Sequence, residues 1–287
     1  MRASGDEQSP GPADEAVRAG SGRGSRPGGG VVRTRPCHRP GHGILRAVSA
    51  DPHSDPPSGD ARRLVVAIDG PSSSGKSTVG AEAARRVHYR FCDTGLLYRA
   101  VAWLALQRGV APADVAGLVP LAAEVSLVPD ARGQLRHVEA GGRDVTAEVG
   151  RAAVDRAVSD YSKVPELRAA LVPRQRALAV DGGVIMAGRD IGTVILPHAD
   201  VKIYLNASAE ERARRRAAQR RTIAGTEADR ILDELRRRDA IDSGRATAPL
   251  RTAADAVIIN TEGNSFEETV RAVVGAIREA EGGVGGD

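Results

Sequence analysis

Aromatic side chains and cysteines are scarce in this chain of 287 residues. Phe, Trp and Tyr together make up 2% of the sequence, which argues against a protein that stacks nucleic-acid bases on aromatic side chains. The two cysteines, Cys37 and Cys92, lie far apart and match no metal-ligand spacing. We therefore expect a reduced, cytoplasmic setting, in which Cys92 is a small buried apolar residue.

Long apolar runs and a strong charge of one sign are lacking as well. No run approaches the roughly 18 apolar residues that span a bilayer, so we predict a soluble protein without a membrane segment. The net charge is only +4, too small an excess to indicate a nucleic-acid partner. Lysine is scarce too, because only Lys76, Lys163 and Lys202 occur among 41 basic residues. Nearly every cation is therefore arginine, the side chain whose planar fork matches phosphate.

The first 61 residues differ in composition from the rest. They contain GSGRGSRPGGG and DPHSDPPSGD and few large apolar residues, so they cannot bury enough surface to offset the entropy of ordering. We predict a disordered extension over residues 1–61, without the apolar core of a signal peptide; alternatively, part of it precedes the true start. Residues 62–282 then form one catalytic domain with inserted segments, and 283–287 a flexible tail.

A glycine-rich stretch, GPSSSGKST, occupies residues 70–78. An apolar, β-branched run at 63–69 predicts a strand before it, and residues at helical spacing follow it. This order matches the G-x-x-x-x-G-K-[ST] pattern of a phosphate-binding loop, whose backbone N–H groups surround an anion. Lys76 would contact the β and γ phosphates, and the Ser77 hydroxyl would ligate Mg²⁺. A Ser-rich turn that matches by chance is the alternative, which the flanking strand and helix disfavour. The candidate loop residues are Gly70, Pro71, Ser72, Ser73, Ser74, Gly75, Lys76, Ser77 and Thr78.

Four further strands are predicted, separated by helix-forming stretches rich in Ala, Arg and Glu. They lie at 88–95, 183–190, 201–208 and 256–263. Alternating strands and helices predict an α/β protein of the P-loop NTPase type, with a parallel sheet covered by helices on both faces. Such a sheet binds its ligands at the carboxyl ends of its strands.

Two segments depart from this pattern. Short alternating runs between Val125 and Val149 predict a small antiparallel insert within residues 121–155. Residues 208–228 begin with Ser208, a candidate helix cap, and carry glutamates followed by many arginines. A solvated helix face is the alternative there. The nucleotide-binding sheet favours an arginine-rich lid, since phosphoryl transfer requires that water be excluded.

Several segments together resemble the bacterial cytidylate kinases, members of the nucleoside monophosphate kinase family. The segments are IDGPSSSGKST, DTGLLYRA, Ser159 with the VPELR run after it, GRDIGTVILP, SAEERARRR and RRRDAIDSGRATAPL. They occur in the family's order between about residues 64 and 250. The resemblance implies transfer of the γ-phosphate of ATP to CMP or dCMP, with Mg²⁺, in a core with a nucleoside-monophosphate-binding insert and a lid. It also implies small-molecule substrates, no stable nucleic-acid partner, no membrane and a monomer.

The resemblance carries site roles onto matching residues of this chain. It implies a base pocket of Ser159, Arg168 and Asp190, whose donors and carboxylate acceptor suit cytosine. The remaining acceptor contacts that it implies are Asp242 and Arg238 for the sugar, Arg99, Arg189 and Arg245 for the phosphate, and Thr94. The lid candidates for the ATP phosphates are Arg212, Arg215 and, with less support, Arg216. Of these residues, we expect Lys76, Arg189, Arg212 and Arg215 to act in catalysis.

Each of these roles has a structural alternative. Arg168 and Arg245 could be surface ion-pair partners, and Asp242 could cap a helix. Ser159 could be an ordinary helix-surface serine. Thr94 and Tyr98 could be turn and packing residues.

One position departs from the family pattern. Many members carry an acidic residue directly before GRD, where this chain has Ala187. That carboxylate would help to order the water shell of Mg²⁺, and Asp69 or Asp190 are candidates to replace it. The rival functions are a kinase of the same fold with another acceptor, a nucleic-acid-binding protein and a GTPase switch, although the guanine-reading N-K-x-D segment is missing.

Overall fold

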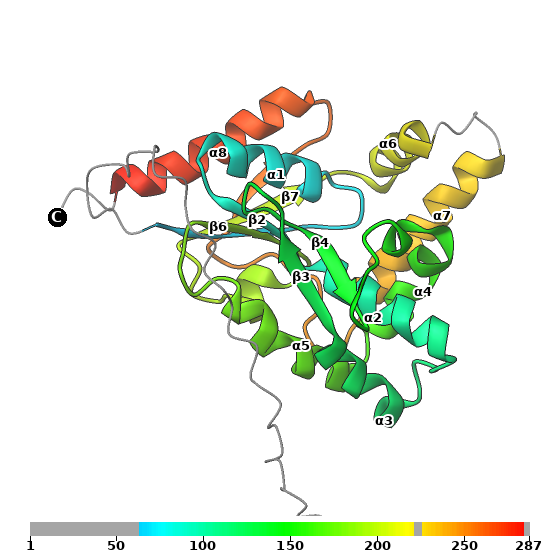
Figure 1. The fold of residues 1–287 in the computed structure, drawn as a ribbon. Helices are drawn as coiled ribbons and strands as arrows, with labels where there is room; N and C mark the ends of the chain where they lie inside the picture. The colour runs from blue at the N-terminus through cyan, green and yellow to red at the C-terminus, as the bar shows by residue number, and fades with distance from the viewer. Residues whose placement is uncertain (1–62, 221–225, 284–287) are drawn as a thin grey trace, which may run out of the picture. The chain divides into compact units, whose positions relative to one another are not determined.

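The computed structural model describes residues 63–220 and 226–283 (Figure 1). The chain divides into two units, Met1–Pro57 and Ser58–Asp287, and the described residues belong to the second. The extension expected at 1–61, the tail residues 284–287 and residues 221–225 of the expected lid lie outside the described part. Within that part, no helix is both long and apolar enough to cross a membrane.

Five parallel strands form the centre of the sheet, as the alternating pattern predicts (Figure 1). They are β1 (Val65–Asp69), β2 (Arg90–Asp93), β6 (Val184–Ala187), β7 (Val201–Asn206) and β8 (Val257–Asn260). Their spatial order is β2-β6-β1-β7-β8. Strand β1 is central, pairs with β6 and β7, and is nearly all buried. The parallel sheet predicted from the sequence is therefore confirmed, and its central strand leads directly into the glycine-rich loop.

Three short strands extend this sheet beyond β2. They are β3 (Val125–Pro129), β4 (Leu135–Ala140) and β5 (Arg143–Asp144), and β4 pairs antiparallel with both β3 and β5. Strand β4 also pairs in parallel with β2, where Leu135 lies opposite Cys92. The antiparallel segment thus continues the main sheet, a connection that local alternation does not predict. Cys92 is fully buried, as expected, and burial raises the pKa of its thiol.

Helices cover both faces of the sheet (Figure 1). On one face, α1 (Lys76–Arg86) packs against α8 (Phe266–Gly283). The other face carries α2 (Gly95–Arg108), α4 (Ala152–Ser162), α5 (Pro165–Ala177) and the short α3 (Val115–Leu118). Each layer has its own apolar core, and each large side chain buried there contributes roughly 1.5–3 kcal/mol of transfer free energy.

Two further helices, α6 (Ala209–Arg220) and α7 (Thr226–Ser243), pack against each other. Their contact is a small apolar core of Ala213, Ile231 and Leu235. The expected cap at the start of α6 is confirmed, because Ser208 Oγ accepts the Glu211 N–H at 3.2 Å. Helix α7 also contacts α4, so residues far apart in the sequence meet near the carboxyl ends of the strands.

Candidate active site

The glycine-rich loop connects the end of β1 at Asp69 to the start of α1 at Lys76. A Cβ atom at Gly70 would lie 2.3 Å from the carbonyl oxygen of Leu205, so only glycine fits against β7 there. Gly75 has φ of 95°, a left-handed conformation that favours glycine. The loop therefore has the close approach and the turn that bring backbone N–H groups and the α1 N-terminus to one point.

Lys76 lies inside this loop and is 6% exposed. Its Nζ donates to the carbonyl oxygen of Pro71 at 2.6 Å and to Ser74 Oγ at 3.2 Å. Burial lowers the pKa of Lys76 well below its usual value, and the charge of Arg189 lowers it further. An added anion would favour the charged ammonium, so the loop is poised to take up negative charge.

Ser77 contacts a carboxylate that was not among the candidate site residues, although it opens the DTGLLYRA segment. Its Oγ donates to Asp93 Oδ2 at 2.6 Å. Asp93 ends β2 and is the register partner of Ala187 on β6. The carboxylate therefore lies beside Ala187, the position where the resemblance leads us to expect an acidic residue. Its place at the carboxyl end of a parallel strand was the available signal in the sequence.

Asp69 and Asp190, the residues expected to compensate for Ala187, are engaged elsewhere. The two carboxylate oxygens of Asp69 accept the N–H groups of Ile191 and Gly192 at 2.9 and 2.7 Å. Burial raises the pKa of Asp69 to about 6, although these hydrogen bonds lower it. Asp190 is paired with an arginine of the expected base pocket.

That arginine is Arg168 of α5, and the pair is buried. Arg168 Nη2 donates to Asp190 Oδ2 at 2.6 Å, and the two side chains are 4% and 6% exposed. The guanidinium lies 5.1 Å from the centre of the Tyr98 ring and also donates to the carbonyl oxygen of Ser162. Ser159 is buried as well. The surface alternatives for Arg168 and Ser159 are therefore wrong, while Tyr98 does pack, beneath the guanidinium.

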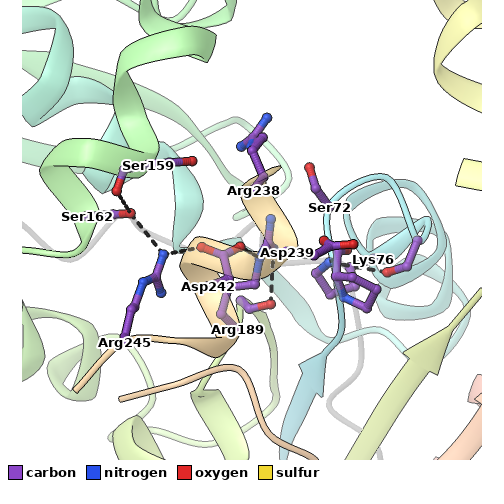
Figure 2. A network of polar contacts seen from close by, with 12 residues as sticks. Ser72, Lys76, Ser159, Ser162, Arg189, Arg238, Asp239, Asp242 and Arg245 are labelled. Atoms are coloured by element: carbon purple, nitrogen blue, oxygen red, sulfur yellow. Dashed lines mark hydrogen bonds and ion pairs between the residues drawn. The ribbon is translucent and has the colours of Figure 1, made fainter. Parts of the chain in front are cut away.

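Asp242 of α7 joins two further arginines (Figure 2). It accepts from Arg189 Nε at 2.8 Å through Oδ2, and from Arg245 Nη2 through Oδ1. Arg245 also donates to Ser162 Oγ at 3.0 Å. Burial alone would raise the pKa of Asp242, but the charges of Arg189 and Arg245 outweigh it and hold the pKa below its usual value. Asp242 thus acts as an ion-pair centre within α7, and the alternatives of a helix cap and a surface Arg245 are wrong.

Thr94 forms a hydrogen bond to strand β6 of the sheet. It precedes α2, and its hydroxyl donates to the carbonyl oxygen of Ala187 at 2.9 Å. This hydrogen bond is consistent with the alternative that Thr94 is a turn residue. Thr94 is nevertheless in the cleft lining, next to Asp93.

Two arginines of α6 contact the glycine-rich loop, and a third contacts the segment after β8. Arg212 donates to the carbonyl oxygen of Ser72 at 3.1 Å and pairs with Asp239 of α7. Arg215 donates to the side-chain and main-chain oxygens of Thr261. Arg216, the candidate with less support, donates to Ser73 Oγ at 3.4 Å. The solvated-face alternative therefore does not hold for these three arginines.

One buried carboxylate was missed altogether. Asp155 of α4 is 4% exposed and accepts from four arginines. They are Arg99, Arg216, Arg220 and Arg238. Burial would raise the pKa of Asp155, but the charges of Arg238, Arg99 and Arg216 hold it well below its usual value. No sequence motif marks a single aspartate within a helix, so only the fold reveals it.

Most of the candidate residues line one cavity of about 670 Å³. The candidate residues in its lining are Ser72, Ser73, Ser74, Gly75, Lys76, Ser77, Thr78, Thr94, Arg99, Ser159, Arg168, Arg189, Asp190, Arg215, Arg216, Arg238, Asp242 and Arg245. The remaining candidates, Gly70, Pro71 and Arg212, are not part of this lining. Among the described residues, four arginines keep a buried Nε–H without a hydrogen-bond partner: Arg168, Arg216, Arg238 and Arg245. Such donors are costly to leave unmatched, and a bound anion would satisfy them.

A phosphate-binding loop and a second set of buried guanidinium groups on one cleft define a P-loop phosphotransferase with an anionic acceptor. The family model for cytidylate kinase matches residues 66–279. A cytidylate kinase of Geobacillus thermodenitrificans (strain NG80-2) is 47% identical over 223 residues, covering 76% of this chain and 98% of its own length. One from Nocardia farcinica (strain IFM 10152) is 44% identical over 209 residues, covering 72% and 90%. The chain belongs to the cytidylate kinase family.

Among solved structures, a gluconokinase from Sinorhizobium meliloti 1021 aligns over 78% of this chain and 97% of its own, with 13% identity and a TM-score of 0.42. A sequence identity and a TM-score this low support no conclusion about function. The family assignment depends on the sequence matches and agrees with the motifs in the chain.

Proposed function

We propose that the protein transfers the γ-phosphate of ATP to CMP or dCMP and releases ADP with CDP or dCDP. The observation that carries this proposal is that the phosphate-binding loop and the Arg168–Asp190 pair face the same cleft. A donor held by the loop and an acceptor whose base meets that pair would bring their phosphates together between them. The named relatives support the same reaction.

The chemistry of the base pocket supports cytosine. The Asp190 carboxylate can accept the exocyclic amine of cytosine, while Arg168 and Ser159 can donate to its carbonyl and ring nitrogen. Uracil carries a carbonyl in place of that amine, which would face the carboxylate and leave both groups unpaired. We therefore expect UMP to be a poorer acceptor than CMP.

The sugar and phosphate of the acceptor would lie along the arginines beside this pocket. Asp242 and Arg238 would hold the sugar, and Arg99, Arg189 and Arg245 would grip the phosphate, with Thr94 beside them. Bidentate guanidinium groups suit a phosphate dianion. Support comes from the unmatched Nε donors of Arg238 and Arg245.

The donor end would bind ATP through residues 70–78, with Lys76 against the β and γ phosphates. Arg212 and Arg215 would support these phosphates from α6. Hard oxygen ligands for Mg²⁺ are available from the Ser77 hydroxyl, with Asp93 2.6 Å from it. Within the described residues, no cluster of three or more acidic, His or Cys side chains could hold a metal ion. This fits Mg²⁺, which is bound through one or two protein oxygens together with phosphates and water.

The proposed reaction is an in-line displacement at phosphorus. An oxygen of the CMP phosphate forms the new P–O bond, and the bond to the ADP oxygen breaks. The nucleophile is already an anion, so no general base is required. The chain contributes positioning and charge, because Lys76 and the arginines offset the repulsion between two polyanions.

An acceptor panel tests the proposal. ATP is supplied with CMP, dCMP, UMP, AMP or shikimate, and ADP release is measured. We expect turnover with CMP and dCMP well above the rest. Preferential turnover with AMP or shikimate would replace the proposal with another kinase of the same fold.

Two finer expectations remain predictions. Loop and acceptor arginines come from one chain, so the reaction needs no second copy and we expect a monomer, which light scattering tests. The cysteine pattern still favours a cytoplasmic setting.

A further inference from the structure

Four guanidinium groups from three helices converge on the single carboxylate of Asp155. Arg99 of α2 donates at 2.7 Å, Arg238 of α7 at 3.0 Å and Arg220 of α6 at 3.1 Å. Arg216 of α6 is the fourth donor. Asp155 itself belongs to α4, so one buried side chain joins four helices.

The two oxygens of Asp155 divide these partners between the two sides of the cleft. Oδ1 accepts from Arg99 and Arg238, which lie on the acceptor side. Oδ2 accepts from Arg216 and Arg220, both on α6. Arg216 in turn donates to Ser73 Oγ in the phosphate-binding loop. The carboxylate is therefore a bridge between the acceptor arginines and the helix beside the donor loop.

The carboxylate holds two of these arginines without using all of their donors. Asp155 binds Arg216 and Arg238 through a terminal nitrogen, and among the described residues the buried Nε of each has no partner. Guanidinium groups this close repel one another, and the repulsion is strong where water is excluded. A shared buried carboxylate offsets that repulsion before any nucleotide binds, and the depressed pKa of Asp155 keeps it ionised at neutral pH.

We propose that Asp155 is a positioning residue for phosphoryl transfer, which holds Arg99 and Arg238 in place for the acceptor and fastens α6 across the cleft. The inference rests on the proposed function for the identity of the nucleotides and for the acceptor role of Arg99 and Arg238. The arrangement of the four arginines does not depend on it. Asp155 acts through these arginines and does not touch the reacting atoms.

The proposal makes a prediction opposite to that of simple charge counting. Replacing Asp155 by Asn removes one negative charge from a site for anions, which by Coulomb attraction alone would tighten nucleotide binding. If Asp155 positions the arginines, Asp155→Asn weakens nucleotide binding instead. We expect KM for CMP to rise on the order of 10-fold to 100-fold, the size of effect that a misplaced binding group produces.

The matched control is Asp160→Asn on the same helix. Asp160 pairs with Lys163 and lies 3.6 Å from Arg237, outside the cleft lining. Its steady-state constants should stay within about 2-fold of the wild type, as for a surface ion pair. Thermal unfolding of both variants gives the folded fraction, so that a loss of folded protein is not read as a change in KM.

Hydrogen exchange of nucleotide-free protein supplies a second readout. Amides of α6 should exchange faster in Asp155→Asn than in the wild type, while those of α1 should not change. Arg220→Gln removes one bond from α6 to Asp155, together with the ion pair between Arg220 and Glu234 of α7, and leaves the acceptor arginines paired. It should show the same acceleration in α6 to a smaller extent, and it covers the case in which Asp155→Asn folds poorly.

An unchanged or lowered KM for CMP in folded Asp155→Asn overturns the proposal, as does unchanged exchange in α6 of both variants. Failure of the proposed function is distinct, because the wild-type protein would then not convert CMP, while the exchange result would still report on Asp155.

Discussion

The donor end and the acceptor end of the cleft are built in different ways. At the donor end, one continuous loop of the chain supplies main-chain N–H groups, Lys76 and Ser77. At the acceptor end, side chains from α4, α5, α7 and the segments after β6 and α7 meet as carboxylate and guanidinium pairs. A local sequence can encode the first, whereas the second exists only when the whole domain is folded.

This difference predicts which properties a substitution changes. Removing one partner from a buried ion pair leaves an uncompensated charge, which costs about 3–5 kcal/mol of folding free energy. Substitutions in the acceptor pairs should therefore reduce both stability and use of the acceptor. Substitutions at Lys76 should reduce turnover and leave the fold intact.

The largest effect is expected at the donor end. Lys76→Met should lower kcat by on the order of 10³-fold or more, the effect of losing a phosphate-clamping cation. Its melting temperature should not fall, since the substitution removes a buried charge. Steady-state kinetics measures kcat and calorimetry measures the melting temperature. Lys163→Met, at an exposed ion pair, is the control. Near-normal turnover of Lys76→Met would contradict the proposed role of Lys76 at the ATP phosphates.

The acceptor end should respond differently. Arg168→Met leaves Asp190 buried without its partner, so we expect KM for CMP to rise by about 100-fold or more, while KM for ATP changes little. The unfolding free energy should fall by about 3–5 kcal/mol. Arg156→Met, at an exposed position on α4, is the control. Equal losses for both nucleotides would mean that Arg168 supports the fold only.

A smaller effect is expected where the two ends meet. Asp93→Asn should raise the Mg²⁺ concentration for half-maximal activity by about 10-fold to 100-fold, as loss of a carboxylate beside a metal ligand does. The substitution leaves KM for CMP unchanged in our account. A Mg²⁺ titration at saturating CMP measures it, with Asp181→Asn, at an exposed loop, as the control. An unchanged Mg²⁺ requirement would mean that Asp93 does not contribute to Mg²⁺ binding at Ser77.

The smallest effect is a pH dependence of stability. Burial raises the pKa of Asp69 to about 6 in the folded protein. A carboxyl with a raised folded pKa stabilises the fold fully below its unfolded pKa, and this contribution is lost as pH rises through about 6. The unfolding free energy of the wild type relative to Asp69→Asn should therefore fall by about 1–3 kcal/mol between pH 4 and pH 7. Urea unfolding at a series of pH values measures it, and a difference that stays constant or grows with pH would contradict it.

The sequence predicts the architecture well because its signals are local. Apolar runs closed by turn residues mark β1, β2, β6, β7 and β8, and GPSSSGKST marks the loop between β1 and α1. The two glycines determine the loop directly, because a Cβ atom at Gly70 would clash with β7 and Gly75 has a left-handed conformation. These features require no knowledge of distant contacts.

The pairings in the site could not be predicted in the same way. Asp155 and its four arginines are separated by up to 83 positions in the sequence, and nothing in the local pattern of α4 distinguishes Asp155 from Asp160. Asp93 was missed for a related reason, because its contact with Ser77 depends on β2 lying beside β6. Tertiary assembly decides which charged residues face the cleft. The site roles given to individual residues stay predictions until they are measured.

The central claim is that one cleft holds the two nucleotides together, phosphate to phosphate. Calorimetric titration with a cytidine and an adenosine joined through a chain of five phosphates tests it directly. If both ends bind at once, the conjugate should bind on the order of 10²-fold to 10⁴-fold more tightly than CMP or ATP alone, and with one molecule per chain. Binding no tighter than that of the better single nucleotide would contradict the claim.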